Sequence, residues 1–406
     1  MKVLRITTSA NTGAISRTAE QLGELVMKEG WESYIAYSRP GNPSSSKLIR
    51  VGNWASIAIH LILTRLFDLC GYGSYFATRK LVKKLKVLSP DLIHIHNIHS
   101  YDINLRVLFD YLSKANIPVV WTQHDCWAYT GHCSYYTKAK CEKWKTCCYD
   151  CSQYRTPPKS LWYDGSRRNF QQKKSLFTSV KNMNLVAVSK WMQGELSQSF
   201  LSNYPITLIY NGIDTSIFRP LQEHAAEVRE KYNLGAKKIL IGVASTWEAR
   251  KGLDDYVKLN ELVRQNYTIV LVGVSDIIKM TLPDNIIGIS RTESMNELAL
   301  LYSASYISLN LSQEESFGKT TPEALACGTP CIVYNSTASP ELVDEGTGMV
   351  VDAGSIDGVY DAIMKIDNWD RETTINKCRE RATSLFSKDE NYKKYIYLYK
   401  RLMGVQ

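Results

Sequence analysis

The sequence predicts an α/β fold of two doubly wound domains, each built on a parallel sheet. The chain has 406 residues, more than one ordinary hydrophobic core holds. Short apolar runs alternate with segments of helical periodicity, which is the pattern of βαβ units. This pattern restarts after residues 211–222, which indicates a hinge. We therefore expect two domains facing across a cleft, with ligands at the carboxyl ends of the strands.

Each expected strand is a short apolar run bounded by polar or turn residues. The first half of the chain contains six of them, at 3–9, 31–38, 91–98, 117–124, 184–191 and 206–214. The second half contains five, at 237–245, 267–275, 285–290, 306–312 and 330–335. A first helix is expected at 15–29, because its apolar residues recur on one face.

The composition, 44% apolar and 22% charged, is typical of a soluble globular protein. The start, MKVLRITTSANTG, reads as a strand rather than a signal peptide, so we expect a cytoplasmic protein. The apolar segment 54–70 is interrupted by His60, Arg65 and Asp68, and it is too short to span a bilayer. It either packs on the sheet or, with Trp54, lies at a membrane interface.

The net charge of +9 is divided unevenly along the chain. Residues 1–200 hold 27 Lys and Arg against 13 Asp and Glu, a net +14, whereas the rest of the chain carries −5. A basic half joined to an acidic half suggests different partners for each. An anionic membrane surface, a phosphate-bearing lipid or a nucleic acid would each suit the basic half.

Residues 314–330, EESFGKTTPEALACGTP, follow the expected strand 306–312. Thr321 is a suitable N-cap, and we expect a short helix at about 322–327. The two glutamates, Glu315 and Glu323, are separated by seven residues, so one lies in the loop and the other in the first helical turn. Both carboxylates can therefore point into one crevice.

The loop amides of residues 317–319 precede a helix N-terminus, where unpaired N–H groups bind phosphate or an oxyanion. Gly318 lets the backbone approach a ligand closely. A carboxylate accepts two hydrogen bonds from a cis-diol such as ribose or a pyranose. The alternative is that Glu323 only complements the helix dipole and Glu315 is solvated.

The glutamate pair, with Phe-Gly after the first and EALACGTP at the second, resembles the donor-site motif of retaining GT-B glycosyltransferases of family 4. Three further segments match the family pattern in the expected order, VSKWM (188–192), IYNGIDTSIFRP (209–220) and STWEARKGL (245–253). The resemblance covers most of the chain and is strongest over 184–350. It implies a GT-B fold, in which two Rossmann-like domains enclose the site.

The resemblance also implies roles for the residues of the motif. Glu323 would bind the ribose hydroxyls of the nucleotide, and Glu315 would hold hydroxyls of the donor sugar. The amides of Phe317, Gly318 and Lys319 would contact the sugar or the diphosphate. These residues would together form most of the donor site.

Four further residues are implied outside the motif. Lys251 would neutralise the diphosphate leaving group. Many members carry an arginine five residues before this lysine; Thr246 stands there, so either Arg250 replaces it or one cation acts alone. His124, at the end of a strand, would face the donor sugar, unless it is structural. Gly13, in the first strand–helix turn, would approach the donor phosphate or the acceptor.

Six of the ten cysteines fall within residues 126–151. Clustered cysteines in a cytosolic protein indicate metal or redox chemistry before disulfides. Cys133, Cys141, Cys148 and Cys151 form one possible set of ligands for a structural zinc. Alternative ligands are Cys126, Cys147 and His132. The other interpretation is reduced thiols or one labile disulfide.

We expect an acceptor-binding domain at 1–218 with a cysteine-rich insertion at about 126–155. A nucleotide-sugar domain should follow at 219–385. The final helix, within 386–406, should pack back on the first domain.

The predicted activity is retaining transfer of a hexose from a nucleotide sugar, with a UDP-sugar first and a GDP-sugar second. The acceptor would be a lipid-linked sugar in capsule, O-antigen or exopolysaccharide synthesis, so the protein would bind the inner face of the membrane peripherally. The chain has no Asp-x-Asp pair, so catalysis should need no metal cofactor. Alternatives are a GT-B epimerase or phosphorylase, or a zinc-stapled protein that binds nucleic acid.

Overall fold

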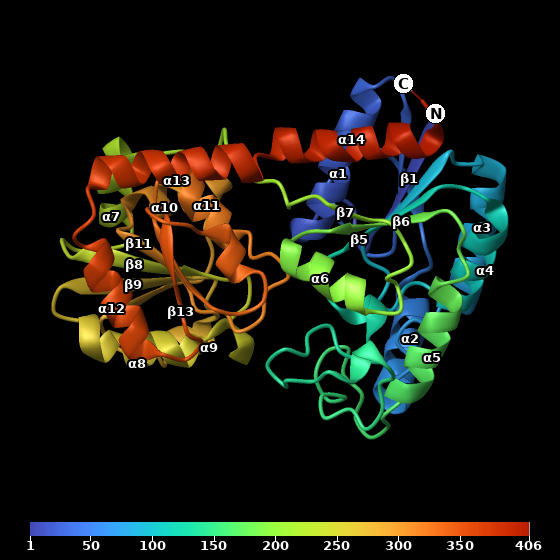
Figure 1. The fold of residues 1–406 in the computed structure, drawn as a ribbon, viewed down its shortest axis with the longest axis horizontal. Coiled ribbons are helices and arrows are strands. Elements are labelled where there is room, and N and C mark those ends of the chain that lie inside the picture. Colours follow the sequence, from blue (N-terminus) through green and yellow to red (C-terminus); the bar gives the residue numbers. More distant parts are fainter. Residues whose placement is uncertain (406) are drawn as a thin grey trace. The chain divides into compact units, whose positions relative to one another are not determined.

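The computed structural model describes residues 1–405 (Figure 1). The chain forms two compact units. Unit 1 comprises Met1–Ile209 and the end of the chain from Tyr392, and unit 2 comprises Tyr210–Asn391. Both units are α/β with a parallel sheet, so the predicted fold class is confirmed. The chain passes from unit 1 to unit 2 at 209–210, whereas the sequence placed the boundary at 218.

Unit 1 holds a seven-stranded parallel sheet in the order β3-β2-β1-β4-β5-β6-β7. The strands are β1 Lys2–Ile6, β2 Glu32–Tyr37, β3 Lys47–Arg50, β4 Leu92–Ile95, β5 Val119–Gln123, β6 Met183–Ala187 and β7 Ile206–Leu208. The order reverses between β1 and β4, which pair with Val3 opposite Leu92. Residues that leave these two strands at their carboxyl ends therefore border the switch point of the sheet.

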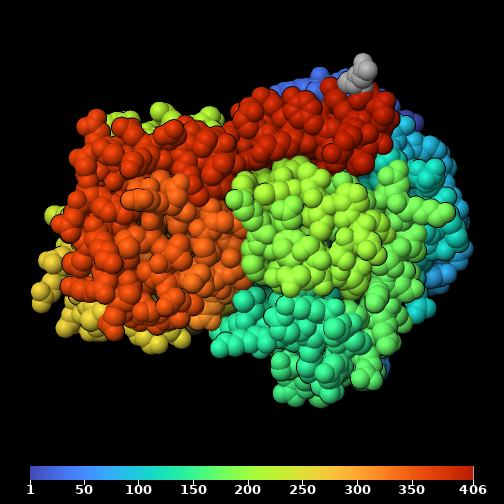
Figure 2. Space-filling view, viewed as in Figure 1, coloured from blue at the N-terminus to red at the C-terminus, as the bar shows by residue number. Residues whose placement is uncertain are grey.

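The central strands β4, β5 and β6 are buried along their whole length, because helices cover both faces of the sheet. The helices of unit 1 are α1 Gly13–Lys28, α2 Trp54–Phe67, α3 Tyr75–Leu88, α4 Leu105–Ala115, α5 Ser166–Phe177 and α6 Lys190–Gln198. The cysteine-rich segment lies between β5 and α5 and contains only the short 3-10 turns Trp127–Tyr129 and Lys143–Lys145. Figure 2 shows it in teal at the surface of unit 1.

Unit 2 holds a six-stranded parallel sheet in the order β10-β9-β8-β11-β12-β13. Its strands are β8 Lys238–Val243, β9 Tyr267–Val272, β10 Ile286–Ile289, β11 Ile307–Asn310, β12 Cys331–Tyr334 and β13 Gly348–Val351. Its helices are α7 Ala225–Lys231, α8 Leu253–Val263, α9 Asp276–Lys279, α10 Met295–Ala304, α11 Thr320–Ala326, α12 Ile356–Ile366 and α13 Arg371–Phe386. The switch point lies between β8 and β11.

The last helix, α14 Lys388–Met403, follows α13 and joins unit 1 from Tyr392 onward. Tyr392, Tyr395 and Tyr399 are buried there in a cluster with Val3 and Val120 of the sheet. The hydroxyl of Tyr399 also lies 2.5 Å from Nδ1 of the buried His94. This helix thus covers one face of the first sheet.

No helix within residues 1–405 is long and apolar enough to cross a membrane. Segment 54–70 contains the helix α2, whose C-cap residue Asp68 has a left-handed backbone.

Candidate active site

Two loops of unit 2 meet at the switch point between β8 and β11. The first carries a 3-10 turn, η4 Ala249–Lys251, and ends at Gly252 with φ +72°. A Cβ at Gly252 would lie 2.3 Å from the carbonyl oxygen of Leu311 in the second loop. The amide of Gln313 donates to the carbonyl of Arg250 over 2.8 Å. This close approach holds the two loops against each other.

The contact brings Lys251 and Glu315 together as an ion pair. Their side chains are only 16% and 10% exposed, so bulk water screens the pair poorly. The amide of Glu315 donates to Oγ1 of Thr337 over 2.8 Å, which fixes the backbone beneath the carboxylate. Thr337 follows β12 and has a left-handed φ of 48°. Sequence reasoning missed this residue, because no motif marks it.

The guanidinium of Arg250 contacts both of these loops. Nε lies 3.0 Å from a carboxylate oxygen of Glu248, and Nη1 donates to the carbonyl of Glu314 over 3.1 Å. Arg250 therefore braces the loop that carries Glu315. Of the two cations that the sequence singled out, Lys251 pairs with the predicted sugar-binding carboxylate.

Phe317 has a buried side chain, and the ring packs at 5.9 Å from Tyr210 and 5.7 Å from Phe386. Only its backbone is available to a ligand in this arrangement. Gly318 has φ +81°, and a Cβ there would lie 3.3 Å from Nδ2 of Asn310. Lys319 occupies the N-cap position of α11.

The predicted N-cap was wrong. Thr321 lies inside α11, and its Oγ1 accepts a hydrogen bond of 3.0 Å from Nδ2 of Asn310. The left-handed turn at Gly318 lets the helix begin earlier, with the amide of Glu323 donating to the carbonyl of Lys319 over 3.0 Å. Glu323 still lies in the first turn of the helix and is partly buried.

In unit 1, His124 directly follows β5. Its Nε2 lies 3.2 Å from Nδ1 of His96, which follows β4, and the two rings stack. Burial and the neighbouring histidines hold the pKa of His96 well below its usual value, so this ring is neutral. The strand ends thus bring two imidazoles together, with His96 buried and His124 on the partly exposed side.

Asp125, the residue after His124, pairs with a further histidine, His99. Nε2 of His99 lies 3.1 Å from a carboxylate oxygen of Asp125, and the other oxygen accepts from the amide of Trp127 over 2.9 Å. The indole of Trp127 stacks on His99 at 4.8 Å. Burial raises the pKa of Asp125, but the charge and hydrogen bond of His99 outweigh it and lower the pKa overall. Asp125 was not among the predicted site residues, although its place next to His124 pointed to it.

Gly13 is the first residue of α1, in the turn that follows β1. It has φ +78°, and a Cβ would meet nothing within 4 Å. The glycine is therefore required by its backbone angle, and the space above it is open within unit 1. It borders the same switch point as the histidines that follow β4.

The four predicted cysteine ligands line one pocket of about 240 Å³ together with Trp144. The amide of Cys151 donates to Asp164 over 2.7 Å, and Cys148 accepts from the amide of Gly131 over 3.1 Å. Within residues 1–405 all ten cysteines are free thiols, and no three ligating side chains are grouped so as to hold a metal ion. Zinc binding stays a prediction.

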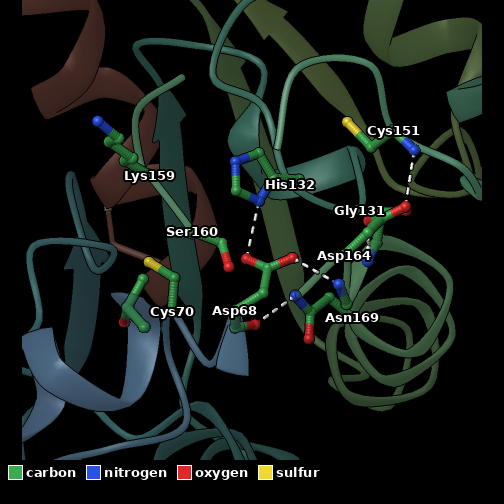
Figure 3. Close-up of polar contacts among 12 residues, drawn as sticks. Asp68, Cys70, Gly131, His132, Cys151, Lys159, Ser160, Asp164 and Asn169 are labelled. Atoms are coloured by element: carbon green, nitrogen blue, oxygen red, sulfur yellow. Dashed lines mark hydrogen bonds and ion pairs between the residues drawn. The ribbon is translucent and has the colours of Figure 1, made fainter. Parts of the chain in front are cut away.

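Both ring nitrogens of His132, one of the alternative zinc ligands, have partners within the protein. Nδ1 pairs with Asp68 at 2.7 Å, as Figure 3 shows, and Nε2 lies 3.2 Å from the carbonyl of Thr156. The second oxygen of Asp68 accepts from the amide of Gly165 over 2.9 Å. This buried pair fastens the cysteine-rich segment to the end of α2.

Comparison with known sequences identifies the family. A profile described as Glycosyltransferase Family 4 matches residues 15–217, half of the chain. The chain belongs to glycosyltransferase family 4. A second profile, Glycosyl transferases group 1, matches residues 225–383 of unit 2.

Among its relatives is WcaC of Escherichia coli K12, named provisionally as a colanic acid biosynthesis glycosyl transferase. It is 22% identical over 99% of this chain and 100% of its own length. A GDP-mannose-dependent phosphatidylinositol monomannoside mannosyltransferase of Mycobacterium tuberculosis is 27% identical over 44% of this chain and 51% of its own.

Solved structures confirm the predicted GT-B fold. Sucrose-phosphate synthase from Thermosynechococcus elongatus superposes with a TM-score of 0.72 at 19% identity, over 99% of both chains. Anabaena HepE in complex with UDP-glucose superposes with a TM-score of 0.70 at 15% identity, over 99% of this chain and 100% of that one.

Proposed function

We propose that this glycosyltransferase moves a hexose, with retention of configuration, from a nucleotide sugar to a sugar hydroxyl of a lipid-linked acceptor. The proposal places it in bacterial polysaccharide synthesis, as the similarity to WcaC suggests. A UDP-sugar is the first candidate donor, supported by the fold shared with HepE, and a GDP-sugar is the second. The observation that carries the proposal is the Lys251–Glu315 pair at the switch point of unit 2.

The pair suggests how the donor is received. A nucleotide diphosphate offers Lys251 a stronger anion than the carboxylate does, so the ammonium transfers its contact to the leaving group. Glu315 is then released to accept hydrogen bonds from the donor sugar. Glu323 accepts hydrogen bonds from the ribose. The amides at Gly318 and Lys319 approach the sugar or diphosphate from the loop.

The reaction breaks the bond from the anomeric carbon to the diphosphate oxygen and forms one to the acceptor oxygen on the same face. The acceptor proton passes to the departing diphosphate. Lys251 stabilises the negative charge that develops there, which makes it the main source of catalysis. The absence of an Asp-x-Asp pair from the sequence supports a metal-independent reaction.

In this proposal unit 1 supplies His124 for the donor sugar, the backbone at Gly13 for the donor phosphate or the acceptor, and the His99–Asp125 pair for the acceptor. His124, the His99–Asp125 pair and the backbone at Gly13 all follow the strands β1, β4 and β5 at their carboxyl ends. Imidazole nitrogens and a carboxylate are suited to sugar hydroxyls.

The structural zinc is a separate proposal. Four thiols in one pocket have the number and chemistry of a tetrahedral site, although within residues 1–405 they are not grouped closely enough to hold a metal ion as they stand. Bound zinc would draw them together and staple a segment that has little regular structure. Metal analysis of protein purified without chelators decides it. About one zinc per chain supports the site, and less than about 0.2 overturns it.

The function is tested by turnover. The chain is incubated with UDP-, GDP- and ADP-hexoses, with and without a lipid-diphosphate-linked sugar, and the anomeric configuration of the product is read by NMR. We expect an acceptor-dependent α-linked product from one α-configured donor, and its loss in Lys251→Ala. Conversion of the donor without acceptor would favour an epimerase, and dependence on orthophosphate would favour a phosphorylase.

A further inference from the structure

Helix α2 buries two polar side chains and exposes several large apolar ones. Its sequence, WASIAIHLILTRLF, is almost entirely apolar, yet its buried residues are His60 and Thr64. Trp54, Ile59, Ile62 and Phe67 of the same helix are instead exposed. A helix that stabilised unit 1 by apolar burial would show the opposite arrangement.

Polar contacts hold α2 in this orientation. Nε2 of His60 accepts from the amide of Gly71 over 2.9 Å, and Nδ1 lies 3.0 Å from Oγ of Ser74. At its C-terminal end, Asp68 pairs with the buried His132 (Figure 3). The buried side of the helix is thus fixed by specific bonds, and four of its large apolar side chains, Trp54, Ile59, Ile62 and Phe67, are left exposed.

Neighbouring segments extend this surface. Gly52, just before α2, lies so close to α3 that a Cβ there would be 3.1 Å from Cβ of Ala77, and the residue before Ala77 is the exposed Phe76. At the other end of α2, the carbonyl of Arg65 accepts from the amide of Leu161 over 2.8 Å, next to the exposed Trp162. The apolar patch is defined by six side chains that are between 50% and 78% exposed: Trp54, Ile59, Ile62, Phe67, Phe76 and Trp162.

A basic groove continues from the patch. The rings of Phe76 and Tyr75 touch edge to face at 5.4 Å, and the guanidinium of Arg79 lies over the ring of Tyr75 at 5.7 Å. Tyr75 and Arg79 both line a cavity of about 1120 Å³ between α3, α4 and α5. Its charged lining consists of five cations, Arg79, Lys83, Lys86, Arg106 and Lys114, and one carboxylate, Asp110.

We propose that the apolar patch and the basic groove form one docking surface for an anionic phospholipid bilayer. The patch has the aromatic and aliphatic side chains that enter the interfacial layer, and the groove has cations that bind lipid phosphates. Charge complementarity favours this occupant, because a patch bordered by five cations and one carboxylate suits an anionic surface. The proposal rests on the proposed function, which supplies a lipid-linked substrate at that surface.

The test is co-sedimentation with vesicles. The full chain is mixed with neutral phosphatidylcholine vesicles, or with vesicles that also contain phosphatidylglycerol, at about 0.1 M and about 1 M NaCl, where the Debye length is about 10 Å and about 3 Å. We expect binding to the anionic vesicles at low salt, weakened at least about tenfold by either reduced anionic lipid or high salt.

Two double variants separate the parts of the surface. Ile59→Asn with Ile62→Asn should reduce binding at both salt concentrations, because it removes apolar insertion. Its control is Ile277→Asn with Met280→Asn at α9 of unit 2, which are 77% and 84% exposed. Lys83→Glu with Lys86→Glu should reduce binding by about tenfold or more at low salt only. Its control is Lys279→Glu with Lys365→Glu, also in unit 2.

Each outcome decides the proposal. It is overturned if the parent chain sediments with no vesicle, or equally with neutral and anionic vesicles. It is also overturned if ultracentrifugation shows a dimer that the isoleucine variant abolishes, because a second copy would then cover the patch. Equal loss in the unit 2 controls would likewise reject it.

The same samples separate this inference from the proposed function. The unfolding temperature is measured with nucleoside diphosphates, which concern unit 2. Vesicle binding without any nucleotide response would support the docking surface and contradict the proposed function. A nucleotide response without vesicle binding would support the proposed function and contradict the docking surface.

Discussion

At the scale of the residue, the donor loop depends on a charged pair and a backbone angle. Lys251 and Glu315 come from loops that are 64 positions apart in sequence, and they meet because Gly252 allows the loops to touch. The motif identified both residues, but only the structure shows that they form an ion pair with each other. The Asp125–His99 pair escaped prediction, because its partners lie in loops that follow different strands, β5 and β4.

Replacing Lys251 by alanine should lower kcat by roughly 10²–10³, the effect of losing one preorganised group that stabilises a developing anion. Steady-state kinetics with the cognate donor measure it. Arg250→Ala is the matched control, because Arg250 braces the loop through Glu248 and Glu314 and should affect KM more than kcat. An equal loss of kcat in both variants would contradict the roles assigned here.

Gly318→Ala should reduce both stability and activity. The left-handed φ of +81° costs an alanine about 1 kcal/mol, and the new Cβ would crowd Asn310. Gly354→Ala is the control, since φ is +84° there but the Cβ would meet nothing within 4 Å. Similar shifts in unfolding temperature, with activity lost only at position 318, are the expected result. Unchanged activity of Gly318→Ala would show that no ligand needs this close approach.

At the scale of the element, apolar runs predicted the interior strands and two of the four edge strands, β7 and β10. The runs at 91–98, 117–124 and 184–191 contain β4, β5 and β6, which are buried on both faces and therefore read as continuous apolar segments. β3 and β13 were not predicted. Each is an edge strand of four residues, and β3 is mostly exposed, so its sequence carries no burial pattern.

Helix α2 shows a different limit of sequence reasoning. Its apolar content predicted a helix, and both interpretations of its surface were compatible with that pattern. The direction of its apolar side was decided by polar anchors, above all the pair Asp68–His132, whose members are 64 positions apart. Such contacts leave no periodic signal in the sequence.

His60 should make this anchoring sensitive to acid. Burial lowers the pKa of His60 to about 4, whereas an unfolded chain protonates the ring near its usual value of about 6.5. Between these values the unfolded state binds a proton that the native state does not, so stability is lost as the pH falls. The loss between pH 7 and pH 4 should be about 3 kcal/mol.

Urea unfolding at several pH values, followed by tryptophan fluorescence, checks this. In His60→Gln the pH dependence should be weaker than in the parent by that amount. The buried His94 and His96 remain in both proteins, so their contributions cancel. His224→Gln is the control, because this exposed ring has a pKa raised by Glu227 and no such acid loss. A parallel pH dependence in parent and His60→Gln would contradict the anchoring role.

At the scale of the whole molecule, the two units repeat one chemical plan. Each has a parallel sheet with a single reversal of strand order, and the site residues border that reversal in each. The alternation of strands and helices was enough to predict this plan, because βαβ units leave few topologies. The sequence of 406 residues does not determine the base, the sugar or the acceptor, because loop shape sets those choices.

In the proposed mechanism a cationic side chain, Lys251, stabilises the donor diphosphate in place of a metal ion, so the transfer rate should be unchanged in excess EDTA. Initial rates with and without EDTA, and after re-addition of Mg²⁺ or Mn²⁺, measure this. Complete inhibition by EDTA that a divalent ion reverses would contradict the metal-independent mechanism.

The central claim, that unit 2 binds a nucleotide sugar through its glutamate pair, is tested most directly by thermal unfolding with UDP, GDP and ADP. A ligand that binds only the native state raises the unfolding temperature by an amount set by its concentration and Kd. We predict that one of the three raises it in the parent and leaves Glu323→Ala unchanged. No response to any nucleotide, or an equal response in the variant, would contradict the account.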